Sequence, residues 1–450
     1  MKKNHVFYRG ALRRRYPVWE SAEGVFIFDS DGKKYLDAMS GISVVNIGYG
    51  VREIADAIAA QALKLPFCFT VRYTSQAQED LAKRIAEISP PALNRVWFSL
   101  SGAGANECAL KAARQFHVET GNPSKYKIIS RWQSYHGSSL GTLSISGAER
   151  WRRNYAPMLV DFPKIAPVNC YRCPFGKNYP DCGLDCAYDL ERVIQYEGSR
   201  YIAAFIAEPI VAGSAGATVP PPEYFKVIRN ICDRHNVLFV ADEVFTGVGR
   251  TGKFYACEHW DVVPDMIGIA KGIAGGYVPL GATVIHERIH DAIYNGSGQF
   301  VNGVTFSGHP VACAAAIAVL NFMEKNDLVK RASEIGAYLM QKLSSGLNFP
   351  MVGQIRGKGL LIGIELVSDR ASRKPFEPEL GVAKKIVAAA FERGLLLQGG
   401  SGCADGVRGD HVLVCPPFTI AETEADRIVD ILCEACEEVQ ESLIDRAAGQ

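Results

Sequence analysis

Three short segments decide the fold: AAFIAEP (203–209), VLFVADEV (237–244) and MIGIAKGIAGG (266–276). Each begins with a short apolar run rich in β-branched or aromatic residues, which predicts a strand buried on both faces of a sheet. A charged residue follows each run, namely Glu208, Asp242 and Lys271. Because ligands of open α/β sheets bind at the carboxyl ends of the strands, we expect these charges to form a site.

Lys271 stands between an apolar run and a cluster of glycines. Burial in such surroundings disfavours the ammonium form, lowers the pKa and leaves a neutral amine that can form a Schiff base with a carbonyl. A lysine at a strand end can also extend its ammonium into water. Glu208 and Asp242, at the ends of the other two predicted strands, favour a buried, reactive lysine.

Size and composition describe an ordinary globular protein. The chain has 450 residues, 48% of them hydrophobic, which is enough for a large core and for two or three domains. A net charge of +1 does not support binding to nucleic acid. We find no apolar run of membrane-spanning length and no signal-peptide pattern. Thirteen cysteines, an odd number, favour reduced thiols and a cytoplasmic location, with small molecules or protein as partners.

Strand-like and helical segments alternate through the middle of the chain, which predicts an α/β fold with a mostly parallel sheet and helices on both faces. Residues 24–38 (GVFIFDSDGKKYLDA) predict a β-hairpin. Helical segments at 311–344 and 381–393, among further strands, predict a second, α+β unit that packs with this hairpin. We therefore expect three parts: residues 1–66 in the small domain, 67–320 as the large domain, and 321–450 completing the small domain.

The segment SGAGANE (101–107) follows the predicted strand RVWFS (95–99) and opens a helix. Small residues at such a turn leave backbone N–H groups free, and the helix N-terminus adds its positive dipole end, so the turn can bind a phosphate. Many α/β turns are rich in glycine only because they pack tightly. The nearby Asp242 and Lys271 favour the phosphate interpretation.

Six motifs occur together in this chain: SGAGANE (101–107), YHG (135–137), EP (208–209), ADEVFTGVGRTG (241–252), AKG (270–272) and TFSGHP (305–310). In these motifs the chain resembles the class III aminotransferases, which are pyridoxal-phosphate (PLP) enzymes of fold type I. The resemblance runs from the hairpin to about residue 417. It implies a large domain with a mostly parallel seven-stranded sheet between helices, and a smaller α+β domain formed by both ends of the chain.

The resemblance assigns roles around the cofactor. Lys271 resembles the Schiff-base lysine, which holds the PLP aldehyde and then moves the proton between substrate and cofactor. Asp242 resembles the acid that keeps the pyridinium nitrogen protonated, so that the ring can accept electrons. Gly102 and Ala103 are implied to bind the phosphate through their backbone N–H groups.

Further cofactor contacts are implied in the same way. Tyr135 is expected to stack on one face of the ring, with His136 of the same motif beside it, and Val244 to pack on the other face. Glu208 is similar to the acid near the cofactor hydroxyl and the substrate. Thr305 resembles a threonine that reaches the phosphate from the neighbouring subunit, which implies a homodimer and leaves a tetramer open.

Two residues are expected at the substrate. Arg408, in a loop rich in glycine and aspartate, resembles a mobile arginine that grips a substrate carboxylate and moves away from other substrates. Such an arginine can also be an ordinary solvated one. Ser43 stands where amine:pyruvate relatives carry an aromatic residue. A serine at this position would widen or polarise the substrate pocket.

The implied activity is transfer of an amino group from an ω-amino acid, amine or amino acid to a keto acid by a ping-pong mechanism. Pyruvate is the expected acceptor, with 2-oxoglutarate next. A PLP-dependent racemase or aminomutase of the same family is an alternative, and it would need no amino acceptor. A non-catalytic zinc-bearing scaffold is another, although the presence of Lys271 and Asp242 argues against it.

Cysteines 170, 173, 182 and 186 lie within one short segment. Pairs of cysteines at such spacing can bind zinc in a structural site. The middle gap is shorter than in common zinc ribbons, so we favour free thiols and expect no metal in the chemistry.

Overall fold

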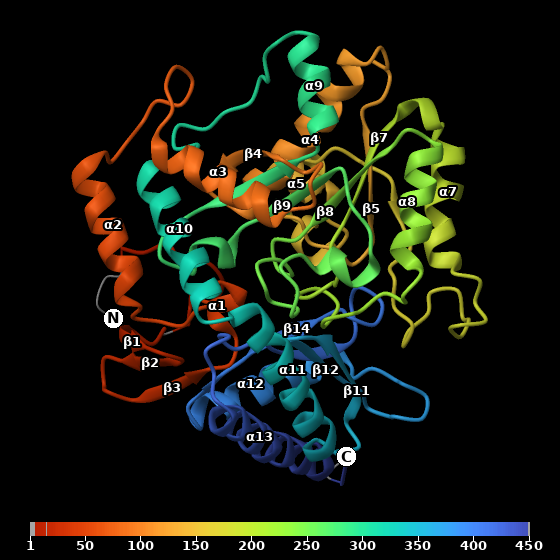
Figure 1. Cartoon of the computed structure of the whole chain (residues 1–450). Coiled ribbons are helices and arrows are strands. Elements are labelled where there is room, and N and C mark those ends of the chain that lie inside the picture. Colours follow the sequence, from red (N-terminus) through yellow and green to blue (C-terminus); the bar gives the residue numbers. More distant parts are fainter. Residues whose placement is uncertain (1–4, 15, 449–450) are drawn as a thin grey trace.

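The structure is a computed structural model that describes residues 5–14 and 16–448. At its centre is a seven-stranded sheet, which lies in the upper half of Figure 1 between helices. One strand, β10, is antiparallel to both of its neighbours, and the other pairs are parallel. The predicted α/β fold is thus confirmed. In spatial order the strands are β4 (Arg95–Ser99), β10 (Gly281–Ile285), β9 (Met266–Ile269), β8 (Leu238–Asp242), β7 (Ile202–Ala207), β5 (Lys127–Arg131) and β6 (Lys164–Ile165).

Strands β7 and β8 are buried along their whole length because helices cover both faces of the sheet. Successive side chains of a strand point to opposite faces, so each strand contributes to two cores. On one face, Phe239 stacks against Phe205 and against Phe225 of α8 (Tyr224–Arg234), with ring centroids 6.2 and 5.8 Å apart. On the other face, Ile206 and Val240 join the core formed by α4 (Gly102–Glu119).

Further helices surround this sheet. They are α2 (Arg52–Lys64), α3 (Gln76–Ile88), α5 (Leu140–Ile145), α6 (Glu149–Arg152), α7 (Asp185–Glu197), α9 (Glu287–Asn295) and α10 (Pro310–Lys325). Of these, α2 and α3 precede its first strand in the chain, α5, α6 and α7 lie between strands, and α9 and α10 follow its last strand.

Two four-stranded sheets lie in the lower half of Figure 1. The predicted hairpin is present as β2 (Phe26–Asp29) and β3 (Lys34–Asp37), with Ile27 opposite Tyr35. Strand β13 (Leu395–Leu396) pairs in parallel with β3, so a late segment of the chain completes the sheet of the hairpin. This sheet also contains β1 (Trp19–Glu23), and the other contains β11 (Val352–Lys358), β12 (Leu361–Leu366), β15 (Asp410–Val414) and β14 (Gln398–Ser401).

Helices α11 (Leu328–Gly346), α12 (Val382–Glu392) and α13 (Glu422–Ala448) cover these sheets, and a short turn, α1 (Ser40–Ser43), follows the hairpin. The small unit is therefore built from both ends of the chain, as expected. The exact boundaries at residues 66/67 and 320/321 stay predictions. Among the described residues, none of the helices has both the length and the apolar content that crossing a bilayer requires.

Gly336 of α11 provides a test of this packing. A Cβ at this position would lie 2.3 Å from the carbonyl carbon of Gly359, in the turn between β11 and β12. Alanine is favoured over glycine in a free helix by about 1 kcal/mol, but overpacking costs about 1–3 kcal/mol. We expect Gly336→Ala to lower the melting temperature, whereas Ser344→Ala, on the exposed side of the same helix, leaves it nearly unchanged. A stabilised G336A variant would contradict this packing.

Candidate active site

The charged ends of three parallel strands line one cavity of about 1450 Å³. Glu208 follows β7, Asp242 ends β8 and Lys271 lies just after β9. The N-terminus of α4 and the loop after β5 line the same cavity. The structure thus brings these predicted residues together at the carboxyl edge of the sheet.

Asp242 is the most firmly held of the three, and only 2% of its surface is exposed. Its Oδ2 accepts hydrogen bonds from Asn106 Nδ2 at 2.8 Å and lies 2.7 Å from His136 Nδ1. Its Oδ1 accepts from the backbone N–H of Val244 at 3.1 Å. The carboxyl group is therefore fixed by α4, by the loop after β5 and by its own turn. A buried acid needs such partners to offset the loss of water.

Lys271 opens a short 3₁₀ turn with φ of 49°, a left-handed conformation that is uncommon for a residue other than glycine. Backbone strain of this kind is found at functional sites. Burial lowers the pKa of its amine from 10.5 to about 8, and Nζ lies 3.9 Å from the centre of the Phe245 ring. The neutral fraction of the amine near neutral pH is therefore far larger than for a lysine in water, and the neutral form is the one that nucleophilic attack requires.

Glu208 is buried, and burial raises its pKa to about 7. One carboxyl oxygen accepts a long hydrogen bond, 3.4 Å, from the backbone N–H of Tyr135. Glu243, next to Asp242, points away from the cavity and accepts hydrogen bonds from Thr246 Oγ1 and Cys257 N. Because successive side chains of an extended chain point to opposite sides, Asp242 faces the cavity and Glu243 faces the core.

The N-terminus of α4 forms the small-residue cradle predicted from SGAGANE. Ser101 caps the helix by accepting a hydrogen bond from Gly104 N, and Gly102 and Ala103 line the cavity. A Cβ on Gly102 would lie 2.5 Å from a methyl carbon of Val244, so only glycine fits there without displacement. Tyr135 also lines the cavity, with its ring centroid 5.5 Å from that of Trp151.

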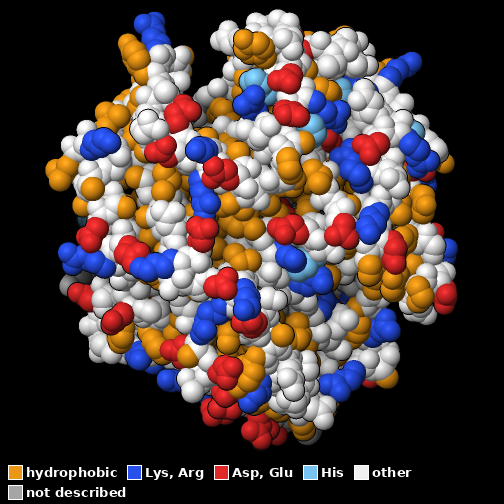
Figure 2. Space-filling model, in the orientation of Figure 1, with side chains coloured by type: hydrophobic (Ala, Val, Ile, Leu, Met, Phe, Trp, Pro, Cys, Tyr) orange, Lys and Arg blue, Asp and Glu red, His pale blue; other side chains and the backbone are white. Residues whose placement is uncertain are grey.

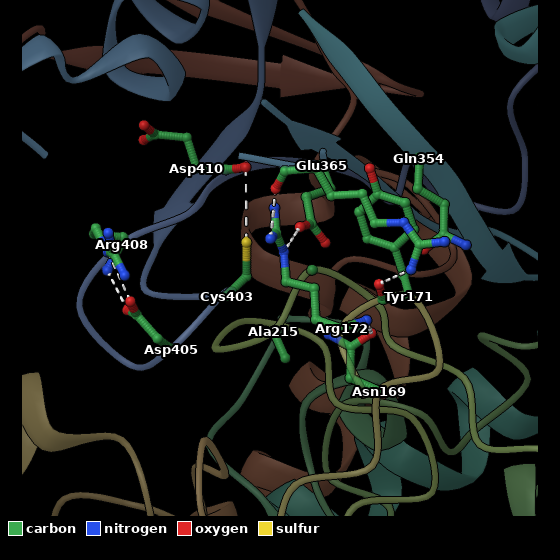
Figure 3. Close-up of polar contacts among 12 residues, drawn as sticks. Asn169, Tyr171, Arg172, Ala215, Gln354, Glu365, Cys403, Asp405, Arg408 and Asp410 are labelled. Atoms are coloured by element: carbon green, nitrogen blue, oxygen red, sulfur yellow. Dashed lines mark hydrogen bonds and ion pairs between the residues drawn. The ribbon is translucent and has the colours of Figure 1, made fainter. Parts of the chain in front are cut away.

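Three predicted contacts lie outside the cavity wall of this chain. Ser43 is buried, and its hydroxyl donates to the carbonyl of Phe245. The backbone at residues 41–43 has left-handed φ angles, and the neighbours Ile42 and Val44 line the cavity instead of Ser43. Arg408 is half exposed and paired with Asp405 at 2.8 Å, as Figure 3 shows. Thr305 lies on the exposed surface. The roles predicted for these residues stay predictions.

Sequence reasoning missed several residues of the site. Asn106 donates a hydrogen bond to Asp242. It lies within SGAGANE, for which the sequence predicted a role only for the small residues. Arg150 and Trp151 of α6 also line the cavity. Asn106 could have been found, since it lies one helical turn after Gly102 and thus on the same side of α4. Nothing in the local sequence sets Arg150 apart from the arginines around it.

The segment with the four cysteines starts in the loop after β6 and ends at Cys186 in the first turn of α7, against the small unit. Figure 3 shows Arg172 of this loop reaching the buried Glu365 of β12, which also pairs with Arg356. All four cysteines are free thiols. Among residues 5–14 and 16–448, no group of three or more His, Cys, Asp or Glu side chains is arranged to hold a metal. The loop therefore serves here as a polar contact between the two units.

The residues of the cavity fit pyridoxal phosphate. Lys271 offers an amine to the aldehyde, and Asp242 offers a fixed carboxyl group to the ring nitrogen. The helix N-terminus at Gly102 offers backbone N–H groups to the phosphate. His136 Nε2 is buried without a hydrogen-bond partner, which leaves a polar atom for a bound group in the same place.

Comparisons with known proteins agree with this fit. The family model for class III aminotransferases matches residues 12–436. The uncharacterized aminotransferase YodT of Bacillus subtilis is 38% identical over 433 residues, covering 96% of this chain and 97% of its own length.

Two solved structures are similar over nearly the whole chain. An (S)-enantioselective ω-transaminase from Thermomicrobium roseum has a TM-score of 0.91 at 35% identity, covering 97% of this chain and 96% of that one. An amine transaminase from an uncultivated Pseudomonas species, in its PLP-bound form, has a TM-score of 0.88 at 36% identity, with 98% of each chain covered.

The lowered pKa of Lys271 leads to a direct test. In cofactor-free protein, labelling of Lys271 by an amine-acylating reagent should rise with pH around a midpoint near 8, because the neutral amine is the reactive form. Peptide mass spectrometry of samples labelled across a pH series measures this midpoint. Lys83, exposed on α3, serves as the control for the reagent itself. A Lys271 midpoint far from 8 would contradict the effect of burial.

Proposed function

Because the chain belongs to the class III aminotransferases, which depend on PLP, we propose that it moves an amino group from an ω-amino acid or amine to a keto acid, with pyruvate as the acceptor. The observation that carries this proposal is the meeting of Lys271 and Asp242 in one cavity large enough for cofactor and substrate together. The reaction is ping-pong, since the donor leaves as a carbonyl compound before the acceptor binds.

Bound PLP supplies an aldehyde that condenses with amines and a ring that accepts the electrons of the bond broken at the donor carbon. Lys271 has two tasks in this scheme. Its neutral amine would link to the cofactor aldehyde, with loss of water, while no substrate is bound. When released by a donor amine, Nζ would be placed to take a proton from the donor carbon and to deliver it to another carbon. A pKa of about 8 suits both directions of this transfer near neutral pH.

Asp242 acts on the ring nitrogen, and its neighbours keep it in place for that task. Asn106 and the Val244 N–H approach the carboxyl group from different sides, so neither oxygen can turn away. His136 Nδ1 adds a third contact and is itself oriented by its chain, since its backbone N–H donates to Ser146 Oγ at 2.9 Å. These contacts would hold the carboxyl group in position for the ring nitrogen without a movement during the reaction.

Exposed apolar side chains support a homodimer. The loop after α2 carries Phe69, Val71 and Tyr73 on its surface, and Figure 2 shows hydrophobic side chains on this projecting loop. It lies beside the segment that contains Thr305, because Thr70 Oγ1 donates to the carbonyl of Ser307 at 3.2 Å. A monomer rarely exposes so many apolar residues together. In the proposed dimer this surface is covered, and Thr305 enters the partner's site.

A half-reaction tests the proposed activity. PLP-loaded enzyme mixed with an ω-amino acid, without any keto acid, should lose the visible absorbance of the lysine-bound cofactor, and pyruvate should restore it. Lys271→Ala should lack that absorbance and lose at least about 1000-fold in turnover, because both the covalent link and the proton-moving amine are gone.

Lys83→Ala is the matched control and should behave as the unaltered enzyme does. Normal turnover by K271A would refute the assigned role. An absorbance that no amine changes, or a product that forms without consumption of keto acid, would refute the transaminase assignment.

The dimer has its own test. Val71→Asp places a charge in the proposed interface and should shift the protein towards monomer in sedimentation or light-scattering measurements, with loss of activity. Tyr196→Asp, on the exposed side of α7, is the control: Tyr196 is 83% exposed and Val71 is 78% exposed. If V71D keeps the same oligomeric state as Y196D, this surface is not the interface.

A further inference from the structure

Arg150 of α6 is an arginine side chain on the cavity wall, and its charge has no acidic partner in the part of the chain that the structure describes. Its guanidinium is held by neutral acceptors. Nη1 donates to the carbonyl of Ser401 at 2.5 Å, and Nη2 donates to the carbonyl of Gly213 at 3.1 Å. Nε is buried with no hydrogen-bond partner. The side chain is thus fixed in place while part of its donor capacity stays unused.

The acids of the cavity do not neutralise this charge. Among the described residues, no ion pair with Arg150 is found. Asp242 is held by Asn106 and His136, and Asp410 accepts instead from the backbone N–H of Ala383. Burial lowers the pKa of Arg150, opposed only by Cys403. A half-buried cation without a counter-charge is unfavourable on its own and favours binding of an anion.

Arg408, the arginine expected to bind a carboxylate, differs from Arg150 in its ion pairing and in its position relative to the cavity. Asp405 accepts from its Nε at 2.8 Å and from its backbone N–H at 2.7 Å, and the pair lies in a loop outside the cavity (Figure 3). To bind a substrate, Arg408 would have to leave this acid. Arg150 would need no such exchange.

An aromatic surface leads from the cofactor end of the cavity to Arg150. Tyr135 lines the cavity beside Glu208, and its ring lies 5.5 Å from that of Trp151. The Arg150 guanidinium carbon lies 5.3 Å from the centre of the Trp151 ring. A carbon chain running along these rings would therefore end at the guanidinium.

We propose that Arg150 binds the terminal carboxylate of the amino donor and so makes the enzyme selective for ω-amino acids over simple amines. This inference rests on the proposed aminotransferase function. Guanidinium and carboxylate match in geometry and charge, and the free N–H groups of Arg150 supply the donors. The carboxylate supplies the ion-pair partner that Arg150 lacks among the described residues.

Matched substrates test this role. For 5-aminopentanoate, Arg150→Gln should raise KM by roughly 10- to 100-fold, the size expected for loss of hydrogen bonds to a charged group. For pentylamine, which lacks the carboxylate, kcat/KM should stay within about two-fold, since the reacting end is unchanged. Arg150→Lys should recover part of the lost affinity, because it keeps the charge but loses the planar pair of donors. Arg153→Gln, exposed just beyond α6, is the control.

A non-reacting ligand separates binding from chemistry. Pentanoate has the carboxylate but no amine, so its affinity for the PLP-loaded enzyme, measured by calorimetry, should fall in R150Q and not in R153Q. Equal loss for 5-aminopentanoate and pentylamine, or unchanged pentanoate affinity, would overturn the proposal. So would a carboxylate-selective loss in Arg408→Gln but not in R150Q. If no amine reacts with the unaltered enzyme, the proposed function fails, and the pentanoate titration still decides the role of Arg150.

Discussion

The site depends on one requirement, that a carboxyl group closed off from water must have its hydrogen bonds supplied by the protein. Asp242 meets it by drawing Asn106 of α4, His136 of the loop after β5 and its own Val244 turn to a single point. These contacts also bring the N-terminus of α4 and the YHG loop to the edge of the sheet where Lys271 emerges. The burial that makes Asp242 need these hydrogen bonds also lowers the pKa of Lys271, which increases the neutral fraction of its amine.

Much of this arrangement could be predicted from the sequence, because it follows from strand periodicity. Apolar runs ending in Glu208, Asp242 and Lys271 predicted parallel strands and a shared edge, and the fold has both. Contacts across the fold were harder to predict. Ser43 is buried within a run of four left-handed residues, 40–43, that no sequence pattern predicts. Asn106 reaches Asp242 only because α4 packs against β9. Arg150 depends on the position of β14, which joins the cavity from the far end of the chain.

The two ends of the cavity are built differently. Strand ends and a helix terminus form the cofactor end, where Gly102 and Val244 lie so close that no larger residue fits. A short helix with Arg150 and Trp151, the turn at Gly213 and the strand β14 form the other end. Loops of this kind can change without disturbing the main core, whereas the strand ends cannot. Under the proposed roles, substrate choice is therefore separable from the chemistry of amino transfer.

The pairing of β13 with β3 governs the order in which the protein can assemble during synthesis. The hairpin is made before the central sheet, but β3 keeps an open edge until residues 395–396 emerge, after all seven strands of that sheet. By then the strands around Asp242 and Lys271 have long been available to fold. The strand ends with Asp242 and Lys271 can thus form first, and the cavity wall that contains β14 forms last. A stalled chain would have the cofactor strands, an unpaired strand edge prone to association, and no complete substrate pocket.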